Sequence, residues 1–417
     1  MHNSVIVLKF GGTSVATPQR IRQVAELVHA KKAKGLKVVV VVSARAKMTD
    51  SLIEDALSFS ADPSPREMDM LLTSGERISS ALLAIALNAR GAAAISLTGS
   101  QAGIITDDDH TNARIIEIRP ARVLQALNED KIAVVSGFQG VSFKKEVTTL
   151  GRGGSDISAV ALASALDAEV CEIYSDVDGV YAADPNVVDE PMKIRQLSYQ
   201  EMQEMAEAGA KVLHPKSVEF AKAKGTIIHA KSTFVPDGEG TIIRNLEGRL
   251  KPRIVGIASE EKVILARCRD EGHAGIIMQL VDSLAAENVK VKQISFSDLG
   301  DGVTSGNFII PEKENYHIES VIPRLEASFP GALHVSRRLG AVSLIGAGIN
   351  DRYDFLLQCL RLLRAEKLGP ASLHTTSFRI SALVPRERVK ETVGLFYENF
   401  LRPASLEHVE PTLHVEP

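Results

Sequence analysis

The 417-residue chain contains no tryptophan, only three cysteines and 5% aromatic residues. Its cysteines, Cys171, Cys268 and Cys359, are far apart and follow no C-x-x-C spacing, which argues against a disulfide framework and against a zinc site. Isolated thiols of this kind are typical of a reduced, cytoplasmic protein. No basic segment precedes an apolar stretch at the N-terminus, so the sequence predicts no signal peptide.

Two further absences limit the partners that the chain is expected to have. No run approaches the roughly 18 consecutive apolar residues of a membrane-spanning helix, so no membrane association is expected. The formal net charge is −4, so there is no overall basic field and nucleic acid is not expected as a partner. Hydrophobic residues (45%) and charged residues (24%) occur at ordinary globular levels, and this length predicts two or three domains.

The first stretch that indicates chemistry is 5–14, with the sequence VIVLKFGGTS. Its β-branched residues predict a buried strand that ends at Lys9, and Gly11 and Gly12 lead on to a helical pattern that begins near Thr17. Glycine amides and a helix N-terminus favour bound anions, and Lys9 adds a full positive charge. The Walker A spacing is absent. The stretch therefore predicts either a phosphate cradle of another kind or a tight turn that merely requires glycine.

Strands and helical segments alternate through the first half of the chain. Such alternation predicts an α/β sheet with helices on both faces. Thr49 and Asp50 are expected to cap one helix, and residues 106–114 are expected to form a polar loop rich in aspartate. Further strands are predicted at 38–43, 93–97, 132–137, 170–174 and, as the last of the series, 227–231.

Two more glycine- or aspartate-rich stretches follow. Residues 148–156, TTLGRGGSD, precede a helix of small residues and predict a second place where an anion can approach the backbone, with Ser155 and Asp156 as plain helix caps in the alternative interpretation. Residues 175–185 carry three aspartates, but their spacing does not match an EF-hand and no glutamate closes the loop, so calcium is rejected.

The C-terminal part repeats a smaller pattern. Residues 236–240 and 245–252 are the clearest candidates for a linker, and after them the order strand-helix-strand-strand-helix-strand occurs twice, at an offset of 79 residues from Val263 to Val342. A duplicated module of this kind suggests ligand sensing or subunit contact. The predicted domains are 1–248 for the catalytic domain and 255–339 and 340–417 for the two modules.

Five motifs, in this order, closely resemble those of aspartate kinases. The resemblance is strong over 5–245, weak over 255–410, and implies an α/β fold: the amino-acid-kinase three-layer α/β/α sandwich followed by two ferredoxin-like ACT modules. The motifs are KFGGTS (9–14), SGER (74–77), LGRGGSD (150–156), SDVDGVY (175–181) and GAKVLHP (209–215).

This resemblance implies ATP-dependent phosphorylation of the side-chain carboxylate of L-aspartate, which gives 4-phospho-L-aspartate, the first step toward lysine, threonine and methionine. The attacking carboxylate is already ionised at neutral pH, so catalysis needs positioning and charge neutralisation rather than a general base. By resemblance, Lys9 and Asp156 would be the catalytic residues, with Lys9 on the transferred phosphoryl group and Asp156 orienting Lys9. No protein metal site is expected, because Mg²⁺ would arrive with ATP and be bound mostly by phosphate oxygens and water.

The resemblance also implies how the two substrates are held. Glu76 would bind the ammonium group of L-aspartate, and Arg152 would pair with its α-carboxylate. Further residues expected on the aspartate and phosphate side are Ser43, Thr49, Gly153, Gly154 and Ser155. Residues expected to contact the nucleotide are Lys9, Phe10, Gly11, Gly12, Ser175, Asp176, Tyr181, Asp184 and Lys211.

Several positions depart from the family pattern. Arg45 and Ala46 stand where the family usually has Met-Gly, so Arg45 is expected to alter substrate access, and Asn186 replaces an arginine, which is expected to weaken ATP binding. In the ACT region, positions that usually contact lysine or threonine differ, as at Thr375 and Thr376. We therefore expect weak or no feedback inhibition by lysine or threonine, with the ACT pair retained for a homodimer or dimer of dimers.

Two other functions stay open at this level. One is an amino-acid kinase acting on another acid, such as glutamate or N-acetylglutamate, although the latter would leave Glu76 without an ammonium partner. The other is a sensor or regulatory subunit without catalysis, which would be expected to lack Lys9 or Asp156, and both are present.

Overall fold

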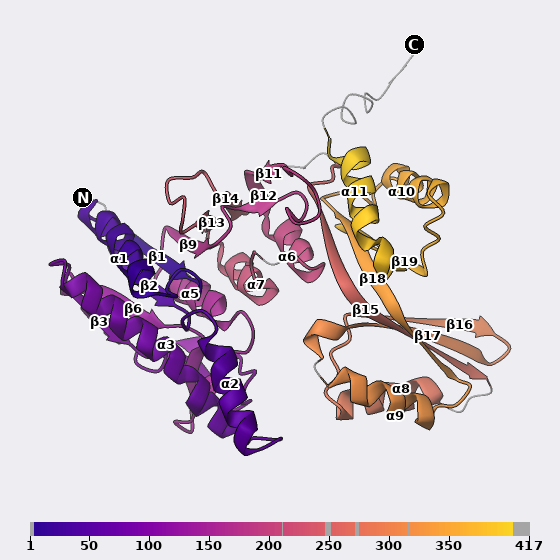
Figure 1. The fold of residues 1–417 in the computed structure, drawn as a ribbon, viewed down its shortest axis with the longest axis horizontal. Coiled ribbons are helices and arrows are strands. Elements are labelled where there is room, and N and C mark those ends of the chain that lie inside the picture. Colours follow the sequence, from indigo (N-terminus) through magenta and orange to yellow (C-terminus); the bar gives the residue numbers. More distant parts are fainter. Residues whose placement is uncertain (1–3, 211, 247–251, 272–274, 316, 403–417) are drawn as a thin grey trace, which may run out of the picture. The chain divides into compact units, whose positions relative to one another are not determined.

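The computed structural model describes residues 4–210, 212–246, 252–271, 275–315 and 317–402 (Figure 1). The chain divides into two compact units. The first unit comprises residues 1–181, 192–207 and 211–249, and the second comprises 182–191, 208–210 and 250–417.

The first unit is built on an eight-stranded, mostly parallel sheet. β1 pairs in parallel with β2 on one side and β9 on the other, whereas β14 runs antiparallel to β13. In sheet order the strands are β12 (Gln196–Ser198), β14 (Thr241–Arg244), β13 (Ile228–Ser232), β9 (Val170–Ser175), β1 (Val5–Phe10), β2 (Lys37–Val42), β6 (Ile132–Ser136) and β3 (Ala94–Leu97).

Helices cover both faces of this sheet, as the α/β expectation required. α1 (Pro18–Ala33) and α3 (Pro65–Asn88) pack on one face, where alternate residues of β1 such as Leu8 and Phe10 join the core. Because side chains alternate along a strand, Lys9 points to the opposite face, toward α5 (Gly154–Ala165). The other helices of this unit are α2 (Met48–Phe59), α4 (Ala121–Asn128), α6 (Tyr199–Glu207) and α7 (Pro215–Lys224).

One helix within the described residues, α3, is long and apolar enough by length and composition to cross a membrane, although it contains no run of 18 consecutive apolar residues. Half of its apolar window is buried within the unit, with Leu83 and Leu87 in the core against β1 and β2. It also carries the buried acidic residues Asp69 and Glu76. These features are those of a core helix of an α/β domain.

A second, four-stranded sheet was not expected from the sequence. It has the order β5-β4-β7-β8, and two of its strands flank the predicted polar loop, which is confined to 107–114. Its strands are β4 (Ile104–Thr106), β5 (Ile115–Ile118), β7 (Gln139–Ser142) and β8 (Val147–Thr149). Residues 227–231 were predicted as the last strand of this unit, but β14 follows them and pairs with β13. Residues 236–240 belong to the turn between these two strands and not to a linker. A short pair, β10 (Val180–Tyr181) and β11 (Lys193–Ile194), completes this unit.

The second unit contains one continuous antiparallel sheet of six strands rather than two separate four-stranded sheets. In sheet order these are β16 (Gln293–Gly300), β17 (Val303–Pro311), β15 (Gly256–Glu271), β18 (Leu333–Ile345), β20 (Arg379–Pro385) and β19 (Ser372–Thr376). Its helices are α8 (Ile276–Ala286), α9 (Ile318–Ser328), α10 (Asp354–Ala365) and α11 (Val389–Phe400).

The long strand β15 explains why the sheet is continuous. Its first half, Gly256–Glu260, pairs with Ala341–Ile345, and its second half pairs with the beginning of β18 and with β17, with register shifts between Glu260 and Leu265. The 340–417 pattern therefore receives its fourth strand from Gly256–Glu260, at the beginning of the 255–339 range. The order predicted from the sequence, strand-helix-strand-strand-helix-strand, would instead put this fourth strand after α11.

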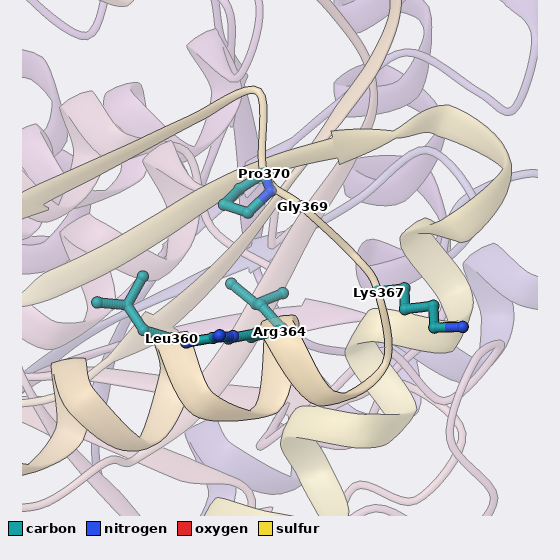
Figure 2. A pocket seen from close by; sticks show the side chains of 6 residues that line it. Leu360, Arg364, Lys367, Gly369 and Pro370 are labelled. Atoms are coloured by element: carbon teal, nitrogen blue, oxygen red, sulfur yellow. The ribbon is translucent and has the colours of Figure 1, made fainter.

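This unit also holds a pocket of about 510 Å³ at the C-terminal end of α10 (Figure 2). It is lined by Leu360, Leu363, Arg364, Lys367, Gly369 and Pro370. None of the residues expected to bind aspartate or ATP lies in it. The candidate site is built instead from strand ends of the first unit.

Candidate active site

The carboxyl ends of β1, β2 and β9 form one edge of the main sheet, because these strands are neighbours and parallel. Backbone hydrogen bonds join the segments that leave this edge. Ser43 N donates to Phe10 O at 3.1 Å, and Gly11 N donates to Tyr174 O at 3.2 Å. The Gly11 amide, which was expected to face a phosphate, is therefore engaged within the fold.

Lys9 and Asp156 form an ion pair across the sheet–helix interface. Lys9 Nζ lies 2.6 Å from Asp156 Oδ1, with the two side chains only 11% and 13% exposed. Asp156 is the third residue of α5, and the residue at the N-cap is Gly153, so the alternative view of Asp156 as a plain cap is wrong. A buried ion pair adds little net stability over apolar packing, so its presence at this edge points to a chemical role.

Close packing brings the first glycine loop to the loop after β2. A Cβ at Gly12 would lie 2.7 Å from Ala44 O, so only glycine fits there. Ala44 N in turn donates to Glu76 Oε1 of α3 at 3.0 Å. Ala44 therefore links the glycine loop, on one side, to the Glu76 carboxylate on the other.

Glu76 is the most perturbed carboxylate of the site. Its side chain is buried, with the residue 4% exposed, and Oε2 has no hydrogen-bond partner within the described part of the chain. Burial raises the pKa of Glu76 to about 7, and the hydrogen bond from Ala44 offsets only part of that effect. A buried carboxylate oxygen without a donor is suited to a cationic ligand group, which would supply the missing hydrogen bonds.

The turn between β8 and α5 carries the second glycine motif. Gly153 has φ +70°, and a Cβ there would lie 2.4 Å from the ring of His214, so both the backbone and the space require glycine. Gly154 and Ser155 are buried in the first turn of α5, whereas Arg152 is exposed just before it. Arg152 thus lies at the surface, one residue before the N-cap of α5.

The loop after β2 differs in detail from expectation. Ser43 is half-buried at the strand end, but α2 begins at Met48 with Lys47 at its N-cap and no side-chain cap, so Thr49 lies inside the helix and does not cap it. Arg45 donates from Nε and Nη2 to Ala16 O at 3.3 and 3.0 Å. Its side chain therefore ties this loop to the segment before α1.

Three of the predicted nucleotide residues lie at the end of β9 or after it, namely Ser175, Asp176 and Tyr181. Ser175 Oγ bonds Val177 in a tight turn, and Asp176 is exposed. Tyr181 donates its hydroxyl hydrogen to Asp178 Oδ1 at 2.5 Å, and this bond to a carboxylate raises the pKa of Tyr181 to about 12. Lys193 pairs with the same carboxylate.

Sequence reasoning missed Asp178 and Lys193 as parts of this cluster. Asp178 lies in the motif SDVDGVY (175–181), and its position three residues before Tyr181 could have indicated a contact between the two side chains. Lys193 comes from β11, and only the pairing of β10 with β11 brings it here.

The last two predicted nucleotide residues are not placed in this site. Asp184 belongs to the second unit, where its carboxylate accepts hydrogen bonds from Asn186 N at 2.9 Å and Asn186 Nδ2 at 2.8 Å. Asn186 stands where the family usually has an arginine that could face a phosphate. Here its backbone and side-chain nitrogens stabilise a turn with Asp184. Lys211 lies outside the described residues.

The sequence matches known proteins along most of its length. Residues 4–230 match the model of the amino acid kinase family. Aspartokinases of Corynebacterium glutamicum and Mycolicibacterium smegmatis are 39% and 41% identical over 407 and 406 residues, which is 95% of this chain and 96% of each relative. The solved structure of E. coli aspartokinase III in complex with aspartate and ADP matches with a TM-score of 0.79 and 25% identity, covering 95% of this chain and 99% of that one.

The first unit, with its sheet and covering helices, is thus that of an amino acid kinase. Within that class, the identity to whole aspartokinases extends through the C-terminal unit as well. The chain belongs to the aspartokinase family.

Proposed function

We propose that this chain transfers the γ-phosphoryl group of ATP to the side-chain carboxylate of L-aspartate, giving 4-phospho-L-aspartate and ADP. One observation carries the proposal: Ala44 links the glycine loop beside the Lys9–Asp156 pair to a buried carboxylate with an unpartnered oxygen. A cationic centre for phosphate and an anionic pocket for ammonium thus occur together. This combination suits an amino acid that attacks a phosphoryl group.

The phosphoryl centre is assigned to Lys9 and Asp156. Lys9 would neutralise charge on the phosphoryl oxygens as it develops, and Asp156, 2.6 Å away, would hold the ammonium in place. The attacking carboxylate is ionised at neutral pH, so the reaction needs no proton acceptor. Mg²⁺ would enter with ATP, bound mainly by phosphate oxygens and water, and would lower the charge of the polyphosphate.

The two ends of aspartate are assigned to different elements. Glu76 of α3 would accept the ammonium group through Oε1 and the unpartnered Oε2. Arg152 would pair with the α-carboxylate, since a guanidinium matches a carboxylate with two parallel hydrogen bonds. Residues proposed to line the same side are Ser43, Thr49, Gly153, Gly154 and Ser155, and those proposed for the nucleotide are Phe10, Gly11, Gly12, Ser175, Asp176, Tyr181 and Lys211.

The test is ADP release with Mg-ATP and L-aspartate, with the acyl phosphate trapped as a hydroxamate. Aspartate-dependent hydroxamate is expected, and K9M should lower its rate of formation by about 10²- to 10³-fold. Turnover with L-glutamate or N-acetyl-L-glutamate but not with L-aspartate would overturn the substrate assignment. No turnover with any of these acids, together with tight binding of one, would favour a sensor.

We also propose that the second unit mediates assembly into a homodimer or dimer of dimers and that feedback control is weak. Apolar side chains stay exposed on its elements, among them Met278 on α8, Phe296 on β16 and Leu357 on α10. Sedimentation over a concentration range tests assembly, and a monomer at all concentrations would refute it. Inhibition by millimolar lysine or threonine, alone or together, would contradict weak control.

The product of the proposed reaction would feed the formation of lysine, threonine and methionine. We place the activity in the cytoplasm, which is consistent with three free, buried cysteines.

A further inference from the structure

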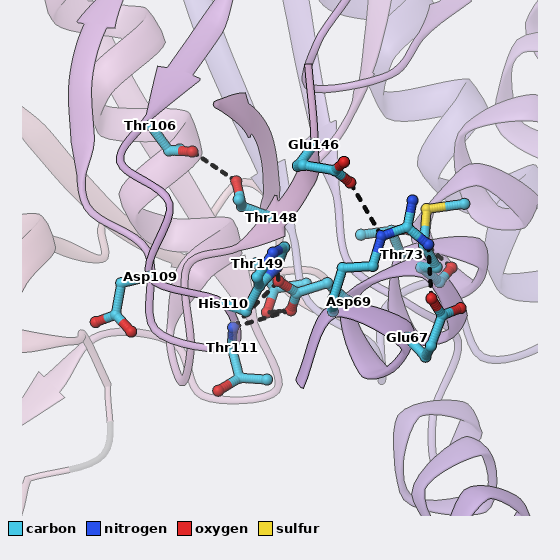
Figure 3. Close-up of polar contacts among 12 residues, drawn as sticks. Glu67, Asp69, Thr73, Thr106, Asp109, His110, Thr111, Glu146, Thr148 and Thr149 are labelled. Atoms are coloured by element: carbon cyan, nitrogen blue, oxygen red, sulfur yellow. Dashed lines mark hydrogen bonds and ion pairs between the residues drawn. The ribbon is translucent and has the colours of Figure 1, made fainter. Parts of the chain in front are cut away.

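Asp69 is a buried acid of α3 that the proposed chemistry does not use. Its residue exposure is 0%, and three groups approach its carboxylate (Figure 3). His110 Nδ1 lies 2.7 Å from Oδ2, Thr149 Oγ1 donates to Oδ1 at 2.6 Å, and Thr111 N lies 3.1 Å from both oxygens. Asp69 therefore joins α3 to the 107–114 loop and to β8.

The positions of these partners connect the two ends of the proposed aspartate site. Asp69 and Glu76 are seven residues apart on α3, so they lie on the same face, about 10 Å apart along the axis. Thr149 is the last residue of β8, three residues before Arg152. The network thus ties the helix that carries Glu76 to the strand that leads into the Arg152 turn.

The 107–114 loop supports the same turn by a second route. Ala113 N donates to Thr149 O at 2.8 Å. Gly151 has φ +71°, and a Cβ there would lie 3.1 Å from Asn112 Oδ1 and 3.3 Å from Thr111 O. The turn before Arg152 therefore packs directly on the loop that Asp69 holds.

Energetics argue that this network does more than stabilise the fold. Burying a carboxylate costs several kcal/mol, and hydrogen bonds offset this cost without a clear surplus over apolar packing. The neighbouring Thr106–Thr148 pair, 2.6 Å between hydroxyls, holds β4 and β8 together without any charge. The Asp69 carboxylate, held by three directed contacts, fixes the orientation of α3 relative to β8 and the 107–114 loop. A single pair of hydroxyls does not fix such an orientation.

We propose that Asp69, with His110 and Thr149, is a positioning group that fixes the Arg152 turn relative to Glu76 and so sets the distance between the sites for the α-carboxylate and the ammonium group. This rests on the roles proposed above for Glu76 and Arg152. Asp69 itself touches no substrate. Its effect falls on recognition of the amino-acid end of aspartate and not on ATP.

The experiment compares three single variants in the full-length chain. T149V removes the hydroxyl that donates to Asp69, and T149S keeps it. T148V is the matched control, since it removes an equally buried hydroxyl from the preceding residue of the same strand. T149V should raise KM for aspartate about tenfold and leave KM for Mg-ATP within about twofold, as expected for lost substrate binding. T149S and T148V should stay within about twofold of the wild type in both.

A proportional rise of both KM values in T149V, or an equal change in T148V, would overturn the proposal, because either result indicates general damage. If T149V does not fold, as judged by circular dichroism, H110Q takes its place with the same expectations.

The R152Q variant separates this inference from the assignment of Arg152. If Arg152 binds the α-carboxylate, R152Q raises KM for aspartate, and adding T149V raises it little further, because the turn no longer carries its ligand group. If R152Q leaves KM unchanged while T149V raises it, the role of Arg152 fails. If the two effects add fully, the coupling through the Arg152 turn is refuted.

Discussion

Titration of Glu76 gives the sharpest prediction. Its pKa is raised from 4.5 to about 7 by burial, so in the free protein the carboxyl group is largely protonated below pH 7 and cannot accept an ammonium group without losing that proton. The aspartate ammonium and side-chain carboxylate keep their charges between about pH 6 and pH 8. KM for aspartate should therefore rise about tenfold from pH 8 to pH 6, with little change in KM for Mg-ATP.

The same pKa shift also predicts that the free energy of unfolding falls as the pH rises. Between pH 4.5 and 7 the folded state holds the Glu76 proton more tightly than the unfolded state, so this residue lowers stability as pH rises through that range and the loss is complete above pH 7. A rise of the pKa from 4.5 to about 7 corresponds to on the order of 3 kcal/mol in the free energy of unfolding. E76Q removes the buried charge and keeps an acceptor for Ala44 N. It should be more stable than the wild type at pH 8, by up to about 3 kcal/mol, with the gain lost near pH 4.

Two measurements check this reasoning. Denaturant unfolding at pH 8 and pH 5 gives the stability difference, and initial rates from pH 6 to pH 8 give KM for aspartate. E201Q is the control, because Glu201 of α6 is also a buried carboxylate, and its Oε2 accepts hydrogen bonds from N and Oγ of Ser198. An E76Q protein that is less stable than the wild type at pH 8, or a KM for aspartate that is flat with pH, would refute the argument.

Three further predictions concern the phosphate and nucleotide side. K9M should lower kcat by about 10²- to 10³-fold, measured as ADP release, and a loss under tenfold would exclude Lys9 from the phosphoryl centre. R45M removes two hydrogen bonds to Ala16 O and should lower the free energy of unfolding by about 1 kcal/mol, so unchanged stability would show that the contact is weak in solution. Y181F should raise KM for Mg-ATP a few-fold through loss of the bond to Asp178, with KM for aspartate unchanged, and a change in the latter instead would move Tyr181 out of the nucleotide site.

Local sequence patterns predicted the elements that carry the site. The β-branched run before Lys9 forms β1, the glycines follow at the sheet edge, and Asp156 falls in the first turn of the small-residue helix. Such features depend on residues close in sequence, where periodicity and glycine chemistry act directly. The resemblance to aspartate kinases was therefore available before any coordinates.

Long-range pairing was not predictable in the same way. The strands β4, β5, β7 and β8 are three or four residues long, too short for a periodic signal, and β15 gives its first half to a sheet partner 85 residues further along the chain. Composition, net charge and turn residues do not indicate which of these strands pair with one another. Helix α3 showed the converse: its composition alone suits a membrane, and only its packing makes it a core helix.

The sequence by itself determined the class of chemistry, because a lysine, paired glycines and acids in fixed order are local properties of the chain. Only the tertiary structure decided which of those groups meet. It brought Asp156 to Lys9, left one oxygen of Glu76 without a donor among the described residues, and placed Asp69 between His110 and Thr149. Burial, which sets the pKa of Glu76 and the cost of each unpaired charge, depends on residues far apart in sequence and exists only once they have packed together.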